Sequence, residues 1–260
     1  MFRTGAKTEI RLKGIVLRIL ECGLNILFPN HCSCCRKVLP ITQKPPYLCL
    51  ACLKLVSVIP LKICPSCGKP LDITGGILNC PYCVKNDFPF TFFVSPLPYD
   101  KTAREMVLNL KFHSTPSAAK TLAYFIHMKL KKLDILTKCN LLVPAPIGRK
   151  RKLKRGYNQS ELICKYLSRL TGIPYANALK KIKDTPPQST LSFRDRAINL
   201  EGAIIADPGI DIHKNIILVD DVFTTGSTLS LCSKILKANG ALSVYAVCAC
   251  RTENEDEEKK

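Results

Sequence analysis

One segment of the chain reads Ile216-Ile217-Leu218-Val219-Asp220-Asp221-Val222-Phe223-Thr224-Thr225-Gly226-Ser227-Thr228. Its first residues form a continuous apolar run rich in β-branched side chains, which is typical of a strand buried on both faces of a parallel sheet. Asp220 and Asp221 come next, and open α/β sheets bind their ligands at the carboxyl ends of such strands. The segment therefore predicts a central strand, two acids at its end, and a loop of small residues that leads into a helix.

Each part of this segment has a chemical use. The backbone N–H groups of residues 225–228, the dipole of the following helix and the loop hydroxyls make a cradle for a dianionic phosphate. Gly226 lets the backbone approach such a ligand closely. Asp220 and Asp221 are good acceptors for a vicinal diol, such as two ribose hydroxyls, and can also hold Mg²⁺ through water. The alternative is that the acids only cap the turn, but the small-residue loop favours ligand binding.

The flanking sequence predicts an α/β fold with a mostly parallel sheet and flanking helices, because short apolar runs alternate with helical patterns from Pro89 onward. Asn158, with Glu161 three residues later, predicts the start of a helix, and Gly172 predicts its end. The predicted helices cover residues 102–112, 118–132, 158–172 and 227–238, and the predicted strands cover residues 140–144, 216–219 and 243–250.

Four Cys-x-x-Cys pairs lie before this α/β region. Two residues between thiolates let both sulfurs reach one tetrahedral ion from a tight turn. The spacing favours two zinc ribbons, the first two pairs holding one structural Zn²⁺ and the last two pairs the other. A zinc ion coordinated by four sulfurs has no open coordination position for a substrate, so its role is structural or in docking. The predicted ligands are Cys32, Cys35, Cys49, Cys52, Cys64, Cys67, Cys80 and Cys83.

Three alternatives stay open for the cysteines. An interleaved pairing, in which the first and third pairs share an ion, also agrees with the spacing. His31 or Cys34 could replace Cys32 or Cys35 as a ligand. A redox-active pair is less favoured, because a thioredoxin-like context would show one such pair and not four. In the zinc interpretation, Gly68 follows Cys67 where a knuckle commonly needs a left-handed backbone, and metal binding and folding are one event.

The composition favours a globular protein with an anionic partner. Hydrophobic residues make up 47% of the chain, which excludes global disorder. No apolar run approaches the roughly 18 residues of a membrane-spanning helix, so we expect no membrane span. The net charge is +19, and it is +21 without the last ten residues, which hold five acids and three bases. Eight thiolates on two zinc ions would lower that value to about +17, so a large excess of positive charge remains.

The chain divides into four parts. Residues 1–27 predict an amphipathic helix with apolar side chains at Leu12, Ile15 and Ile19, which packs on its own protein or, as the alternative, on a membrane surface. Residues 28–88 form the double zinc-ribbon module, residues 89–251 the α/β domain, and residues 252–260 a charged flexible tail. Fifteen cysteines without a secretory signal predict reduced thiols and a cytoplasmic location.

Residues 216–228 resemble the phosphoribosyl-diphosphate-binding motif of type I phosphoribosyltransferases. The rest of the chain narrows the resemblance to the ComF family, the competence-associated phosphoribosyltransferase-like proteins with a zinc-binding amino terminus. The resemblance covers nearly the whole chain, from the cysteine knuckles to Ala249. Its further motifs are Tyr99 with Lys111-Phe112, Val143-Pro144-Ala145-Pro146, Arg155-Gly156-Tyr157-Asn158-Gln159, Asp184-Thr185-Pro186-Pro187-Gln188, Leu191-Ser192, Arg196 and Asn199-Leu200.

This resemblance implies a type I phosphoribosyltransferase-like fold that binds 5-phosphoribosyl 1-diphosphate with Mg²⁺ and transfers phosphoribosyl to an acceptor that the sequence does not identify. Asp220 and Asp221 would hold the ribose hydroxyls and act in catalysis. Residues 184–199 correspond to the hood loop of such enzymes, with Arg194 and Arg196 as catalytic charges. The other substrate-binding residues are Thr224, Thr225, Gly226, Ser227 and Thr228 at the 5′-phosphate, Pro144 and Ala145 at the pyrophosphate, and also Val222, Phe223 and Lys111. The pyrophosphate loop departs from the family in lacking a basic residue before Arg149.

A basic run lies between these motifs and predicts an anionic partner. It consists of Arg149, Lys150, Arg151, Lys152, Lys154 and Arg155. Pyrophosphate could use one or two of these charges, and the others suit the backbone of single-stranded DNA or are a solvated face. Two hypotheses follow: a phosphoribosyltransferase linked to DNA uptake, or a non-catalytic zinc-ribbon protein that binds single-stranded DNA. The family resemblance adds competence-machinery proteins as partners.

Overall fold

The computed structural model describes residues 29–40, 42–71, 80, 83, 88–113, 115–183 and 202–252. Three sequence predictions lie outside these residues. They are the amino-terminal helix of residues 1–27, the hood loop with Arg194 and Arg196, and the tail after Thr252. Among the described residues, no helix has the length and apolar character needed to cross a membrane.

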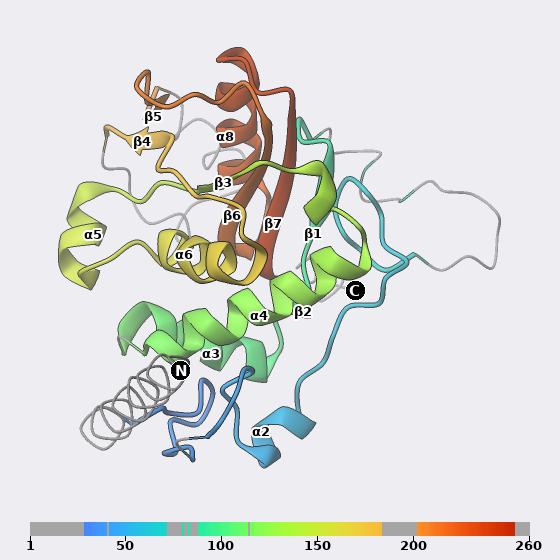
Figure 1. Cartoon of the computed structure of the whole chain (residues 1–260), viewed down its shortest axis with the longest axis vertical. Helices are drawn as coiled ribbons and strands as arrows, with labels where there is room; N and C mark the ends of the chain where they lie inside the picture. Colours follow the sequence, from blue (N-terminus) through green and yellow to red (C-terminus); the bar gives the residue numbers. More distant parts are fainter. Residues whose placement is uncertain are drawn as a thin grey trace, which may run out of the picture.

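The core of the fold is a parallel sheet with strand order β1-β7-β6-β3 (Figure 1). The strands are β1 (Phe92–Val94), β3 (Leu141–Pro144), β6 (Asn215–Phe223) and β7 (Ser243–Arg251), and the short β2 (Leu97–Pro98) also pairs with β7. The β-branched run at the start of β6 lies between β3 and β7 and is fully buried, because both faces of this sheet are covered. The predicted α/β fold class is confirmed.

Helices cover the two faces of the sheet in separate layers (Figure 1). The layer on one face consists of α3 (Lys101–Phe112), α4 (Pro116–Lys132) and α6 (Gln159–Thr171). On the other face, α8 (Ser227–Ala238) packs on β6 and β7. Alternate residues of β6 supply the two cores, so that Ile217 and Val219 belong to the first and Ile216 and Leu218 to the second.

Local sequence signals explain the ends of these helices. Asp100 caps α3 by accepting a hydrogen bond from the N–H of Ala103 (2.9 Å). Asn158 caps α6 in the same way, accepting from the N–H of Ser160 (3.1 Å), and Gly172 ends α6 with a left-handed backbone (φ 75°). The predicted limits of α6 are therefore confirmed.

The structure differs from the sequence prediction in two places that matter for the site. The basic run forms a short helix, α5 (Arg149–Arg155), which the left-handed Gly156 ends (φ 79°). Strand β6 continues through both acids to Phe223, because it keeps pairing with β7 as far as Arg251. A small antiparallel pair, β4 (Leu179–Lys181) and β5 (Ile204–Ala206), and the short η2 (Leu136–Lys138) complete the α/β part.

The two cysteine ribbons lie against different parts of the α/β domain. The first, which contains the short α2 (Leu50–Lys54), lies beneath α3 and α4 in Figure 1. Asn109 of α3 donates to the carbonyls of Ser33 (2.9 Å) and Cys34 (2.7 Å), and the hydroxyls of Ser33 and Thr121 are 2.7 Å apart. The second ribbon contacts β1, where the N–H of Phe93 donates to the carbonyl of Pro65 (2.7 Å).

Candidate functional site

The eight predicted cysteine ligands gather into two clusters of four sulfurs. One cluster is Cys32, Cys35, Cys49 and Cys52, and the other is Cys64, Cys67, Cys80 and Cys83. Within each cluster the sulfurs all lie within 4.8 Å of one another, with 3.8 Å between Cys35 and Cys49 and 3.5 Å between Cys67 and Cys80. Four sulfurs at ~2.3 Å from a tetrahedral zinc ion would be ~3.8 Å apart, so both clusters fit this metal.

The pairing scheme of consecutive Cys-x-x-Cys units is confirmed, and the interleaved scheme is wrong. His31 and Cys34 are not members of the first cluster. Gly68 has the predicted left-handed backbone (φ 70°). Burial raises the pKa of Cys67 to about 12, so a cation must displace this proton before the thiolate can serve as a ligand.

The two acids lie at the carboxyl end of β6 and have different partners. Ser160, at the start of α6, donates its hydroxyl to Asp220 Oδ1 (2.9 Å), which also accepts from the N–H of Asp221 (2.8 Å). Burial and the neighbouring charge of Asp221 raise the pKa of Asp220 to about 7, although these hydrogen bonds and Lys111 act in the opposite direction. A hydrogen-bond donor or a cation that approached Asp220 would stabilise its ionised form.

Asp221 forms an ion pair with Lys111, the last basic residue of α3. Lys111 Nζ lies 2.7 Å from Asp221 Oδ2, and both side chains are largely buried, with 23% and 14% of their surfaces exposed. Burial acts to lower the pKa of Lys111, but the charge and hydrogen bond of Asp221 outweigh it and raise that pKa. The structure thus brings Lys111, Asp220 and Asp221 together.

The predicted phosphate loop connects β6 to α8. Gly226 has a left-handed backbone (φ 77°) and is the N-cap of α8, so this helix starts without a side-chain cap. The hydroxyls of Thr225 and Ser227 are 2.8 Å apart. An uncapped helix start beside two hydroxyls can bind an anion through backbone N–H groups.

The residues after β3 reach the same edge of the sheet. The N–H of Ala145 donates to the carbonyl of Val219 (2.8 Å), which continues the pairing of β3 with β6 beyond Pro144. Asn158 donates to the carbonyl of Ala145 (2.9 Å) while it caps α6. Pro144 and Ala145 therefore lie beside the acids, and Asn158 and Ser160 fix their position. Asn158 was predicted as a helix start and as part of a family motif, whereas Ser160 was missed because no local pattern distinguishes it.

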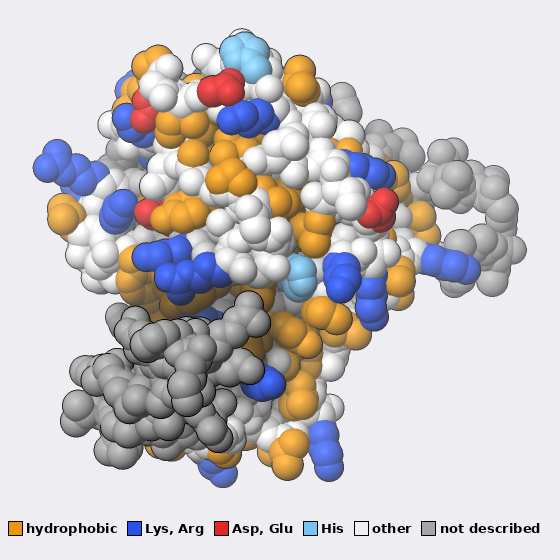
Figure 2. Space-filling view, viewed as in Figure 1, with side chains coloured by type: hydrophobic (Ala, Val, Ile, Leu, Met, Phe, Trp, Pro, Cys, Tyr) orange, Lys and Arg blue, Asp and Glu red, His pale blue; other side chains and the backbone are white. Residues whose placement is uncertain are grey.

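The six basic residues lie on or near the surface along α5. Arg149, Lys150, Lys152 and Lys154 are exposed, and Arg151 and Arg155 are half-buried. Arg155 donates to Gln159 (3.0 Å), and its guanidinium group lies 5.6 Å from the centre of the exposed Phe112 ring. On the face seen in Figure 2, Lys and Arg side chains are widespread and Asp and Glu are few.

An aromatic groove begins beside α5. It has a volume of about 420 Å³ and is lined by Pro116, Arg155, Gly156, Tyr157, Leu162 and Tyr166. The charged groups of Lys120 and Arg169 lie 5.8 and 5.3 Å from the centre of the Tyr166 ring. The groove therefore combines aromatic walls with several cations.

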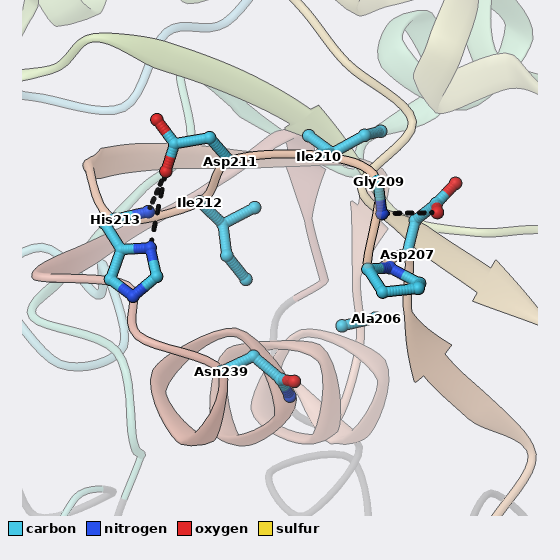
Figure 3. A pocket seen from close by; sticks show the side chains of 9 residues that line it. Ala206, Asp207, Gly209, Ile210, Asp211, Ile212, His213 and Asn239 are labelled. Atoms are coloured by element: carbon cyan, nitrogen blue, oxygen red, sulfur yellow. Dashed lines mark hydrogen bonds and ion pairs between the residues drawn. The ribbon is translucent and has the colours of Figure 1, made fainter.

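A second depression, of about 400 Å³, lies at the opposite, amino end of β6 (Figure 3). Asp207, Asp211 and His213 line it together with Asn239, the residue that follows α8. Asp211 accepts from the backbone N–H of His213 (3.0 Å), as the dashed line in Figure 3 shows. None of its residues is a predicted site residue, so substitutions of its acids are suitable controls for the acids of β6.

These features define an α/β protein with a carboxylate pair and an uncapped helix start at one sheet edge, and with two four-cysteine metal sites. Residues 23–85 match the family model of the double zinc ribbon domain. The DNA utilization protein YhgH of Salmonella typhimurium is 31% identical over 229 residues, which cover 86% of this chain and 98% of that protein. Competence protein F of Haemophilus influenzae is 31% identical over 219 residues, covering 82% of this chain and 93% of the relative.

This chain belongs to the ComF family. Among solved structures, it is similar to the glutamine phosphoribosylpyrophosphate amidotransferase of B. subtilis, complexed with ADP and GMP, at 18% identity and a TM-score of 0.38. That similarity covers 55% of this chain and 30% of the amidotransferase chain. A TM-score of this size supports no conclusion on activity.

Proposed function

We propose that this protein binds 5-phosphoribosyl 1-diphosphate with Mg²⁺ at the carboxyl end of β6 and transfers the phosphoribosyl group to an acceptor. One observation carries the proposal: two adjacent carboxylates lie near the carboxyl end of the central strand, which a short loop connects to a helix that starts without a side-chain cap. The family resemblance supplies the ligand that such an arrangement suits, since a diol needs acceptors and a phosphate needs N–H donors.

In this proposal Asp220 and Asp221 accept hydrogen bonds from the ribose hydroxyls. Their present bonds to Ser160 and Lys111 leave lone pairs for this purpose, because each carboxylate oxygen can accept more than one bond. The N–H groups of residues 225–228 hold the 5′-phosphate, and the pyrophosphate lies beside Pro144 and Ala145. Arg194 and Arg196 would neutralise the leaving charge.

Mg²⁺ fits this site by the chemistry of its donors. A buried carboxyl group whose pKa is raised to about 7 gains from a nearby cation, and Mg²⁺ binds carboxylate oxygens directly or through water. Bound with the pyrophosphate, it would stabilise the negative charge that develops as the glycosidic bond breaks. Lys111 holds Asp221 in place and keeps the local charge balanced before the ligand arrives.

Ligand affinity should depend on pH through Asp220. Diol binding requires the ionised carboxylate, so affinity rises as pH passes the pKa of about 7 and falls below it. We expect about fourfold tighter binding at pH 8.5 than at pH 6.5, a range that lies above the phosphate pKa of about 6. Calorimetry in buffers of different ionisation enthalpy should also show proton release near pH 7. Constant affinity without proton release would contradict this role.

A second function, binding of single-stranded DNA, has its own observation in the aromatic groove beside α5. Single strands bind where bases stack on aromatic rings beside cations that follow the phosphates. Phe112, Tyr157 and Tyr166 supply the rings, and α5 supplies the charge. The names of the relatives, DNA utilization protein and competence protein, support a role in the handling of DNA with competence-machinery proteins. A cytoplasmic location is part of this proposal, because four-cysteine zinc sites need reduced thiols.

Reversing two charges on α5 should weaken this DNA binding. We expect Lys150→Glu with Lys154→Glu to lower the affinity for an oligothymidine at least tenfold and to reduce the slope of log affinity against log salt by about one to two. Lys234→Glu with Lys237→Glu, on α8, makes the same charge change on the other face of the sheet and should have little effect. Fluorescence anisotropy over a salt series measures both quantities, and equal losses in the two variants would exclude a specific site at α5.

A further inference from the structure

A cluster of phenylalanines connects the second cysteine ribbon to the phosphate loop. The rings of Phe93 and Phe223 are 4.3 Å apart, and Phe88 meets Phe223 edge-on at 5.8 Å. Phe90 stacks on Phe88 at 5.1 Å and completes the cluster. Phe93 and Phe223 are fully buried, and the cluster lies in the core between the sheet and α8. It therefore has little freedom to move independently of its neighbours.

The ribbon holds one side of this cluster. A Cβ atom on Gly68 would lie 2.6 Å from the Phe93 ring, so the knuckle backbone is in close contact with that ring. The carbonyl of Pro65 accepts the N–H of Phe93 at 2.7 Å. Both contacts come from the Cys64–Cys67 knuckle, whose conformation depends on the four sulfurs that hold a metal.

The phosphate loop rests on the other side of the cluster. A Cβ atom on Gly226 would lie 2.8 Å from ring atoms of both Phe223 and Phe88. Gly226 is the N-cap of α8, so the position of these two rings fixes where the helix start presents its N–H groups. The Phe223 backbone is itself held by Thr252, which donates its N–H to the Phe223 carbonyl (2.9 Å).

We propose that the second ribbon positions the phosphate loop through Phe88, Phe93 and Phe223. The four-cysteine site at Cys64, Cys67, Cys80 and Cys83 then does more than fold its own ribbon: its knuckle sets the loop geometry on which phosphate binding depends. This inference rests on the proposed phosphoribosyl diphosphate site. The first ribbon has a separate role, because it packs on α3 and α4.

Gly68→Ala tests the contact, and Gly172→Ala is its matched control. Both glycines have a left-handed backbone, at φ 70° and 75°, so both substitutions impose similar backbone strain. Only at Gly68 does the new Cβ meet the Phe93 ring, whereas nothing lies within 4 Å of it at Gly172. Zinc content and melting temperature are measured for both variants. Phe88→Ala provides a second test that leaves every sulfur ligand in place, should Gly68→Ala lose metal.

Two readouts separate the outcomes. Without ligand, we expect amide hydrogen exchange of residues 224–228 to be at least tenfold faster in Gly68→Ala and Phe88→Ala than in Gly172→Ala. With phosphoribosyl diphosphate and Mg²⁺, we expect at least tenfold weaker binding in the same two variants. If the wild type fails to bind this probe, the proposed function is wrong, while the exchange result still tests the coupling. If both variants exchange and bind like Gly172→Ala, the positioning role is wrong.

Discussion

Asp220→Asn combined with Asp221→Asn should abolish binding of phosphoribosyl diphosphate, with a loss of affinity of at least 100-fold. The oxygen of an amide can still accept hydrogen bonds, but the amide brings an N–H₂ group against the diol and lacks the charge that a nearby Mg²⁺ requires. Isothermal titration calorimetry at pH 8 measures the loss.

The two single substitutions should differ in stability, which separates folding from binding. Asp221→Asn leaves the largely buried Lys111 without its ion pair, and we expect a lower melting temperature. Asp220→Asn removes a buried carboxyl group whose raised pKa makes the charged form unfavourable, so at pH 8 it should cost little stability. Asp207→Asn with Asp211→Asn changes the net charge equally at the opposite end of β6 and should leave binding intact. Unchanged affinity in the Asp220 and Asp221 double variant would remove both acids from the site.

Purified protein should contain two zinc ions per chain, and their removal should unfold both ribbons. The ribbons bury few aliphatic side chains of their own, and the sulfur clusters organise each knuckle. We expect Cys35→Ser and Cys83→Ser each to reduce the count to one. Cys34→Ser should keep two ions, because Cys34 is outside the first cluster. Mass spectrometry under native conditions gives the counts, and hydrogen exchange over residues 29–83 reports the unfolding.

A count of one in the wild type, or loss of metal in Cys34→Ser, would contradict this ligand assignment. Cys139→Ser is a further control, since this buried thiol belongs to the α/β core. The thiol protons also give the metal affinity a pH dependence. Burial raises the pKa of Cys67, so metal must compete with protons and should bind more weakly as pH falls.

Sequence reasoning predicted those parts of the fold whose causes are local. The β-branched run of β6 indicated a buried strand, and Asn158 and Gly172 marked the limits of α6, because capping depends on neighbouring residues. The sulfur clusters were predictable for the same reason, since each knuckle brings two thiolates together from adjacent positions. Residues 149–155 were noted only for their charge, and the helix that they form was missed.

The contacts that complete the site could not be predicted, because they join residues far apart in the chain. Ser160 and Asp220 are 60 positions apart in the chain, and no pattern near either residue indicates their hydrogen bond. Lys111 was named only through the family resemblance, and its pairing with Asp221 depends on the tertiary fold that brings the end of α3 to the end of β6. The contact between Gly68 and Phe93 is likewise tertiary. A left-handed glycine explains the turn at this knuckle, but not the ring that lies on it.

We expect the edge of the sheet after β6 to bind a phosphorylated ribose. A crystal of the full chain soaked with phosphoribosyl diphosphate and Mg²⁺ tests it most directly. The predicted electron density places the ribose hydroxyls within hydrogen-bond distance of Asp220 and Asp221, and the 5′-phosphate on the N–H groups of residues 225–228. Density for the ligand at another place, or an empty loop at saturating ligand, would contradict the claim.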